Sequence, residues 1–321
     1  MERLQQLGLA VARRLIDRAD VLIEGFRPGV MERLGLGPDL CTRDNPKLVY
    51  ARMTGWGQAG PWASRAGHDI NYLALSGALH AIGESDRPPV PPLNLAADYG
   101  GGTMFLLFGV LAALFERSQS GRGQVVDAAM VDGVPAMMGL IHQLVAQGQW
   151  REARAANLLD GGAPFYRCYA TADGQSVSVG ALEPAFFAEL VERLGLDPSW
   201  CAAQYDRARW PDMRALFERT FAAQPRSYWE AVFAEGDACV APVLTFSEAA
   251  RHPHIAARNG WQTLDGVPQA APAPRFNRTP ATVPSPPGAA GADAADILAE
   301  VGYAEGEQRT LGECGAVSFP A

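Results

Sequence analysis

The stretch from Thr103 to Glu116 is an almost unbroken apolar run of helical length, and it follows three consecutive glycines at 100–102. The run predicts a helix, with Asp98 just ahead of its start. A carboxylate there can simply cap the helix by accepting backbone N–H bonds. Three glycines are more than a cap needs, because they remove side chains where another group can approach the backbone.

A histidine follows a turn-rich segment upstream of this helix. Residues 57–67 contain several glycines and a proline, which predicts a loop that ends at His68. Taken alone, such a histidine is more often structural than catalytic. Together with Asp98 it suggests an acid/base or nucleophile pair, since neutral imidazole and ionised carboxylate both accept protons near neutral pH.

Composition limits the class of protein. The chain has 321 residues, of which 48% are hydrophobic and 19% charged, which is typical of a soluble globular protein with a large core and room for two domains. The net charge of -8 argues against nucleic acid or an anionic membrane as the main partner, but it allows a local basic pocket for a phosphorylated ligand.

The cysteines and the apolar runs indicate the cellular compartment of the protein. The five cysteines are scattered and form no CxxC pair, so neither a disulfide framework nor a zinc site is indicated and a cytoplasmic location fits. No secretory signal is visible, and no apolar run approaches the ~20 residues of a membrane span without a glycine or charge. We therefore expect no membrane partner.

The N-terminal part predicts an α/β fold. An amphipathic helix over 1–19 leads into an apolar strand at 20–24 and a turn at 25–29. Arg27 lies in that turn, at the carboxyl end of a strand, where open α/β sheets bind ligands; a solvated arginine in a tight turn is the plainer interpretation. A second strand is expected at 48–53.

The glycines after this second strand, at 55–60, satisfy the GxGxxG pattern. We reject a dinucleotide site because proline and a further loop follow where that fingerprint needs a helix. The segment is expected to bend the chain toward His68.

The remaining chain predicts a second domain and an arm. A strand turns into a helix over 125–148, and Asp173-Gly174 predicts a hairpin that is followed by three helices. Pro- and Ala-rich sequence over 268–291 predicts an extended arm, followed by a short helix and a loosely held tail beyond Gly302. The expected divisions are a large α/β domain at 1–150, a small α+β domain at 160–250, and an arm with a C-terminal helix at 265–321.

Several long motifs resemble one known family. They include Gly67-His-Asp-Ile-Asn-Tyr72, Asn94-Leu-Ala-Ala-Asp-Tyr-Gly-Gly-Gly102, Ala19-Asp-Val-Leu-Ile-Glu-Gly-Phe-Arg-Pro-Gly29 and Leu159-Asp-Gly-Gly-Ala-Pro-Phe165. In order and spacing they are similar to the racemase members of the family III CoA-transferases, also called CaiB/BaiF-like. Members usually begin with a further strand, helix and strand, so the resemblance implies a truncated or late-starting N-terminus here.

The resemblance implies a Rossmann-like large domain, a smaller α+β domain and an interlocked homodimer, with the active site built between the large domain of one chain and the small domain of the other. It implies an acyl-CoA substrate, a place in fatty acid and lipid metabolism, and no metal or redox cofactor, since CoA is part of the substrate. The residues it nominates for contact with CoA or substrate are Gly25, Phe26, Arg27, Arg33, Gly67, Asp69, Ile70, Asn71, Tyr72, Gly100 and Gly101.

By the same resemblance, the reaction is epimerisation at the carbon next to the thioester carbonyl. His68 serves the S epimer, Asp98 serves the R epimer, and Glu183 hydrogen-bonds the histidine from the smaller domain. From the residues alone, Glu183 reads as a solvated carboxylate at a helix start. Backbone N–H groups near Asp98 and its glycines are our candidates for stabilising the enolate oxygen.

Two alternatives stay open. In the true CoA-transferases of the family, an aspartate matching Asp98 is a nucleophile; those enzymes generally lack the histidine, which favours the racemase interpretation. The chain could also be an inactive, truncated protein that binds CoA ligands. Acyl-chain preference depends on a groove that the sequence does not locate.

Overall fold

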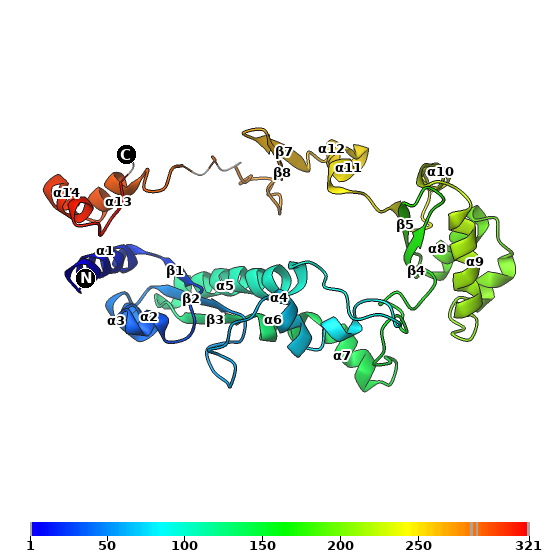
Figure 1. The fold of residues 1–321 in the computed structure, drawn as a ribbon, viewed down its shortest axis with the longest axis horizontal. Coiled ribbons are helices and arrows are strands. Elements are labelled where there is room, and N and C mark those ends of the chain that lie inside the picture. The colour runs from blue at the N-terminus through cyan, green and yellow to red at the C-terminus, as the bar shows by residue number, and fades with distance from the viewer. Residues whose placement is uncertain (1, 283–284, 287, 320–321) are drawn as a thin grey trace. The chain divides into compact units, whose positions relative to one another are not determined.

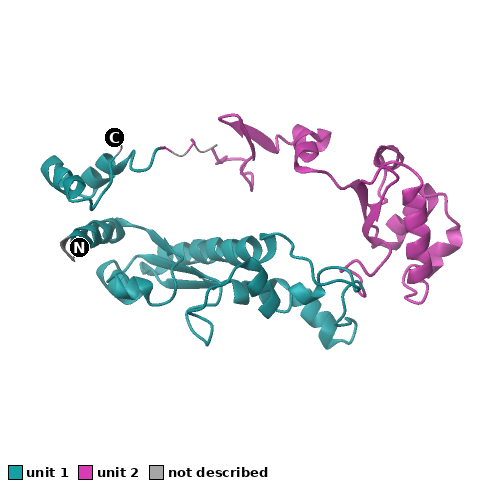
Figure 2. Ribbon diagram, viewed as in Figure 1, with its two compact units in different colours: residues 1–155, 289–321 teal, residues 156–288 magenta. Residues whose placement is uncertain are grey.

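The computed structural model describes residues 2–282, 285–286 and 288–319, and the chain divides into two units (Figure 2). The first consists of residues 1–155 and 289–321, and the second of residues 156–288. Each unit has its own sheet and its own buried core. Residues 265–288, which the sequence analysis places in a third segment, belong to the second unit in the structure.

The first unit has mixed α/β content (Figure 1). In chain order its elements are α1 (Glu2–Arg18), β1 (Val21–Glu24), α2 (Val30–Arg33), α3 (Pro38–Asp44), β2 (Val49–Thr54), α4 (Asp69–Leu75), η1 (Leu79–Ala81), η2 (Leu95–Thr103), α5 (Met104–Ser120), β3 (Val125–Ala129), α6 (Met130–Met137), α7 (Gly139–Ala146), α13 (Ala294–Glu300) and α14 (Glu305–Glu313). The helix and two strands predicted over 1–53 are confirmed. No helix begins within the glycines at 55–60, as expected from their loop composition.

Three parallel strands form the sheet of this unit, in the order β1-β2-β3. The central strand β2 is buried over its first four residues, as expected for a parallel strand covered by helices on both faces. Val49 and Ala51 pack against α5 on one face, whereas Tyr50 packs with Ile16 and Met31 of α1 and α2 on the other. Alternation along the strand puts Arg52 on the side of Tyr50, toward α2.

A π-helix, η2, runs directly into α5, so residues 95–120 form one helical segment. Asp98 therefore lies within the first turn of a helix and not ahead of it; the three glycines do not break the helix because α6 packs against them. By length and composition this segment could cross a membrane, although Asp98 and the glycines at 100–102 interrupt its apolar run, as the sequence analysis expects. One side of α5 is nevertheless buried on the sheet, through Leu106, Val110 and Ala113.

The C-terminal helices α13 and α14 pack against α1 (Figure 1). Tyr303 and Leu311 are buried with Leu298 against Val11, and the guanidinium carbon of Arg14 lies 4.1 Å from the centre of the Tyr303 ring. The expectation of a loosely held tail beyond Gly302 is therefore wrong as far as residue 319. The apolar face of α1 supplies a surface that the tail covers.

The second unit contains an antiparallel sheet in the order β4-β5-β6, a separate β7-β8 hairpin, and helices. Its elements are β4 (Tyr166–Ala170), β5 (Ser176–Gly180), α8 (Pro184–Arg193), η3 (Pro198–Ala203), α9 (Trp210–Ala222), α10 (Arg226–Val232), β6 (Val240–Pro242), α11 (Phe246–Arg251), α12 (Pro253–Ala257), β7 (Trp261–Leu264) and β8 (Val267–Ala270). The hairpin predicted at Asp173-Gly174 is confirmed, with Gly174 at φ 74°. Buried aromatic side chains make up much of the core, namely Phe165, Tyr169, Phe187, Trp210, Phe217, Phe221 and Trp229.

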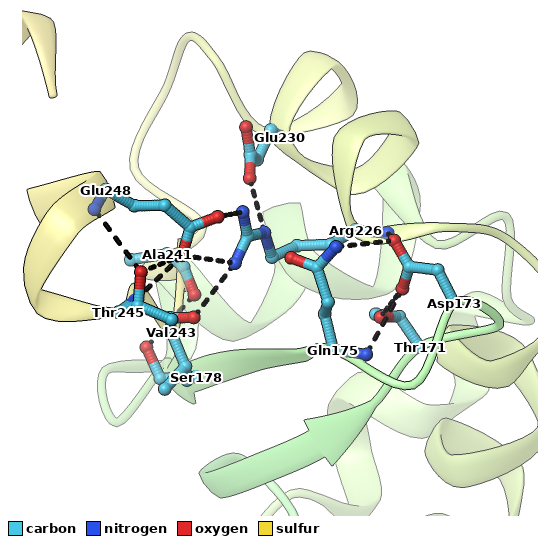
Figure 3. Close-up of polar contacts among 10 residues, drawn as sticks. All are labelled: Thr171, Asp173, Gln175, Ser178, Arg226, Glu230, Ala241, Val243, Thr245 and Glu248. Carbon is cyan, nitrogen blue, oxygen red and sulfur yellow. Dashed lines mark hydrogen bonds and ion pairs between the residues drawn. The ribbon is translucent and has the colours of Figure 1, made fainter. Parts of the chain in front are cut away.

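Arg226 joins four segments of this unit (Figure 3). Its guanidinium donates to Glu230 on its own helix, to Glu248 on α11 and to the carbonyl oxygen of Val243. Its backbone N–H donates to Asp173 in the hairpin turn, 3.2 Å away. The chain that leaves β6 is therefore fixed to the second unit as far as α11.

Candidate active site

The loop after β1 forms one wall of a cavity of about 280 Å³. Gly25, Phe26, Arg27 and Pro28 line it, and the side chains of Phe26 and Arg27 are exposed. Arg33, at the end of α2, does not line the cavity. Its guanidinium folds back over Gly29, where an added Cβ would lie 3.1 Å from Nη1.

The segment that leads to His68 also lines the cavity. Gly67, His68 and Tyr72 line it, together with Trp56 and Arg65, which sequence reasoning missed. Trp56 follows the carboxyl end of β2, and this position was the signal that could have identified it. Its indole nitrogen is buried and has no hydrogen-bond partner among the described residues.

Charge in the cavity is positive. Arg27 and Arg65 line it with His68, and no carboxylate lines it within the part of the chain that the structure describes. Arg65 lies over the ring of Trp62, with its guanidinium carbon 4.7 Å from the ring centre. Two guanidinium groups at one cavity suit a ligand with phosphate groups, because each group can bond two oxygens at once.

His68 is the N-cap residue of α4. Its backbone N–H donates to Oδ1 of Asn71 at 3.0 Å, and its carbonyl oxygen accepts from the N–H of Asn71. The imidazole is exposed. Asn71, which the resemblance nominates for ligand contact, thus caps the helix in this structure, and Ile70 is exposed without lining the cavity.

Asp69 connects this helix start to the helix that carries Asp98. It is 6% exposed, and its Oδ2 accepts hydrogen bonds from the backbone N–H groups of Ala97 at 2.9 Å and Asp98 at 2.8 Å. These two N–H groups therefore already donate to Asp69. They are not the donors to an enolate oxygen that the sequence analysis expects near Asp98. Asp69, nominated for ligand contact, has a structural role here.

Asp98 itself is half-buried, and Oδ2 is 3.4 Å from the amide nitrogen of Asn94. Burial raises the pKa of the Tyr72 hydroxyl, and the negative charge of Asp98 adds to that increase. Tyr72 lines the cavity with His68, whereas Asp98 does not line it.

The glycines after Asp98 allow helices to pack closely. A Cβ on Gly101 would lie 2.7 Å from Val134 of α6, and one on Gly133 would lie 1.8 Å from the carbonyl oxygen of Gly101. Gly100 is next to the side chain of Met137. Gly100 and Gly101, nominated for ligand contact, thus lie against α6, because only glycine permits this approach.

Glu183 lies in the second unit, at the N-cap of α8. Its side chain is exposed and makes no capping hydrogen bond. Burial raises the pKa of the Cys239 thiol, and the charge of Glu183 contributes next. The structure thus places Glu183 on the surface of the second unit.

Comparisons of the sequence and of the structure with known proteins point to the same family. Residues 5–294 match the family model described as CoA-transferase family III. The chain is 48% identical over 304 residues to the alpha-methylacyl-CoA racemase of Mus musculus, which covers 94% of this chain and 79% of that protein. For the Homo sapiens racemase the identity is 46% over 284 residues, 88% of this chain and 74% of that protein. The crystal structure of a CaiB/BaiF family protein from Brucella suis is similar with a TM-score of 0.76 at 26% identity, covering 91% of this chain and 78% of that one.

Proposed function

Because the chain belongs to CoA-transferase family III, we propose that it is a racemase that interconverts the R and S epimers of 2-methylacyl-CoA thioesters. The observation that carries this proposal is the connection between His68 and Asp98. His68 is the N-cap of α4 and Asp98 lies in the first turn of η2, and the carboxylate of Asp69 ties these two helix starts together. Two proton-accepting groups of different chemistry are thereby held on a common support.

In the proposed reaction, one group removes the proton at carbon 2 and the other delivers a proton to the opposite face. Removal leaves an enolate that is conjugated with the thioester carbonyl, so the negative charge develops on oxygen. His68 accepts the proton of the S epimer and Asp98 that of the R epimer, and their roles reverse with direction. The chemistry needs no metal or redox cofactor, because the thioester itself makes the carbon acid accessible.

The CoA part of the substrate is proposed to bind along the cavity beside β1. Arg27 and Arg65 offer the positive charge for its phosphate groups, and the exposed ring of Phe26 offers an apolar surface. Arg33, over Gly29, lies close enough to this loop to add a third cation. A soluble CoA ester and five free cysteines fit a cytoplasmic enzyme.

We further propose that the enzyme is a homodimer in which Glu183 of one subunit orients the imidazole of His68 in the other. An apolar face of α5 supports a second copy as the partner, since Phe108 is 74% exposed and Leu111 and Phe115 are also exposed at helical spacing. Exposed apolar surface of this extent on a soluble chain marks an interaction site. A second copy is preferred to lipid because the opposite side of α5 is packed on the sheet.

Epimer-specific hydrogen exchange tests this function. Each pure epimer of a 2-methylacyl-CoA is incubated in heavy water with wild-type protein, His68→Ala, Asp98→Ala and the control His142→Ala, an exposed histidine on α7. We expect inversion with deuterium at carbon 2, retained by the control and lost or made one-sided in the two active-site variants.

Other outcomes assign the alternatives. Transfer of CoA to an added carboxylic acid without exchange would identify Asp98 as the nucleophile of a CoA-transferase. Neither reaction, together with a rise in Tm on adding acyl-CoA, would identify a CoA-ligand binder.

A further inference from the structure

A single guanidinium holds both ends of the loop that carries Phe26 and Arg27. Nε of Arg52 donates to Oε1 of Glu24 at 2.8 Å, and Nη1 donates to Oε1 of Glu32, also at 2.8 Å. Glu24 is the last residue of β1, and Glu32 lies in α2, directly after the loop. The loop of residues 25–29 is thus bracketed by two carboxylates that share one arginine.

Glu24 also contacts the backbone of the loop directly. The second carboxylate oxygen of Glu24 accepts a hydrogen bond from the backbone N–H of Phe26 at 2.7 Å. Glu24 is 4% exposed and Arg52 is 6% exposed, so the contact between these two side chains is shielded from water. Charge-assisted hydrogen bonds in such surroundings are short and directional, and they hold the backbone in one arrangement.

The side chains of Phe26 and Arg27 are exposed, so they do not anchor the loop of residues 25–29 to the rest of the unit. The Phe26 side chain is 55% exposed, and the guanidinium of Arg27 has no hydrogen-bond partner among the described residues. Gly29 turns the chain into α2 at φ 82°, a left-handed conformation that favours glycine. The bonds to Glu24 and Arg52 therefore hold the loop together with the backbone hydrogen bond from the N–H of Val30 to the carbonyl oxygen of Arg27.

We propose that Arg52 is a positioning residue for the acyl-CoA: through Glu24 and Glu32 it presets the loop of residues 25–29 as a wall for the CoA part of the substrate. The identity of the ligand rests on the proposed function. A preset loop binds without the entropic cost of becoming ordered. His68 at the start of α4 and Asp98 in the first turn of η2 lie on other helical segments, so these contacts of Arg52 act on binding and not on proton transfer.

Glu32→Ala is the informative variant, because the Glu32 side chain is 43% exposed and its removal leaves the buried Glu24–Arg52 pair intact. Glu32→Gln keeps a hydrogen-bond acceptor without the charge. Asp39→Ala is the matched control, since Asp39 is an exposed carboxylate on the neighbouring helix α3 with no hydrogen-bond or ion-pair partner within the described residues. Thermal unfolding of each variant verifies that the fold is retained.

Two readouts are compared, KM and kcat with the thioester substrate and the Kd of free CoA by calorimetry. For Glu32→Ala we expect KM and Kd to rise about 5- to 10-fold, with kcat within about twofold of wild type. Glu32→Gln should be intermediate and Asp39→Ala unchanged. Arg52→Lys should raise KM similarly, and adding Glu32→Ala to it should have little further effect, because an ammonium group cannot bond both carboxylates as a planar guanidinium does.

The Kd of free CoA, measured by calorimetry, tests the role of Arg52 independently of racemase activity. If no epimerisation is found but CoA binds wild-type protein more tightly than Glu32→Ala, the positioning role stands and the racemase proposal fails. Equal affinity of CoA for the two proteins, no binding of CoA to wild type, or a fall in kcat at unchanged KM would each overturn the role of Arg52.

Discussion

The carboxylate of Asp69 accepts a hydrogen bond from the backbone N–H of Asp98, with 2.8 Å between Oδ2 and the nitrogen. Asp69 follows His68 in the chain, so the side chain beside one proposed base holds the first turn of the helix that carries the other. Because Asp69 is buried, water does not compete for this bond. The relative placement of the two bases therefore depends on a residue that need not touch substrate.

Replacing Asp69 should affect both directions of the reaction alike. Asp69→Ala removes the acceptor of two hydrogen bonds, and we expect the free energy of unfolding to fall by about 2–3 kcal/mol. Exchange from the R and S epimers should decrease by similar factors, and Asp69→Asn, which keeps one acceptor oxygen, should lose less. Epimer-specific exchange rates and urea unfolding measure both effects. A loss confined to one epimer would contradict the shared positioning role.

A methyl group at Gly101 should separate η2 from α6. Its Cβ would lie 2.7 Å from the backbone nitrogen and side chain of Val134, so Gly101→Ala should destabilise the protein by about 1–3 kcal/mol. Gly8→Ala is the control, because that glycine lies in α1 with nothing within 4 Å of an added Cβ. There we expect a gain of about 0.5–1 kcal/mol from helix propensity. Equal effects of the two substitutions on urea unfolding would refute the packing role of Gly101.

The buried pair of Glu24 and Arg52 should be sensitive to loss of one partner. Glu24→Ala leaves a buried guanidinium without its buried partner and should lower the free energy of unfolding by about 3–5 kcal/mol. The half-exposed Glu32 should cost at most about 1 kcal/mol when replaced by alanine. Denaturant midpoints of the two variants test the difference, and a larger effect at Glu32 would show that burial is not the deciding factor.

The second unit should lose stability in acid through Glu248 (Figure 3). The hydrogen bond from Arg226 and those from Thr245 lower the pKa of Glu248 from 4.5 to about 2. A folded-state pKa below the unfolded value means that the contribution is complete above pH 4.5 and is lost as the pH falls toward 2. Glu248→Gln should therefore lower Tm at neutral pH, and its difference from wild type should narrow as the pH falls below 4.5. A difference that stays constant down to pH 2 would contradict this assignment.

The apolar face of α5 should control oligomeric state. Phe108→Asp introduces a charge where the side chain is 74% exposed in the single chain, and it should weaken self-association by at least about tenfold. Gln119→Asp, at an exposed polar position of the same helix, should leave association unchanged. Light scattering across a dilution series measures both. A wild-type protein that is monomeric at every concentration would exclude the dimer.

Local patterns were enough to predict most helices and strands of the chain. The alternation around Asp173-Gly174 predicts the hairpin, the amphipathic pattern of residues 1–19 predicts α1, and the apolar run of residues 103–116 predicts α5. The path from the glycines after β2 to His68 is also a local property, because no helix can start within that loop. These features depend on residues that are close in sequence.

Long-range contacts were not predictable in this way. The sequence gives no sign that Asp69 bonds the N–H groups of Ala97 and Asp98, because 28 and 29 residues separate the partners. The fixed position of the tail against α1 likewise depends on Val11 meeting Leu311 and Tyr303.

The sequence by itself determined the elements, the identity of the reactive side chains and, through its motifs, the family. Only the tertiary structure decided which of those side chains share a cavity, that the glycines after Asp98 serve the packing of α6, and that Arg52 holds the loop of residues 25–29 from behind. The physical reason is that backbone preference acts over a few residues, whereas hydrogen bonds and close packing join whatever groups the fold brings together.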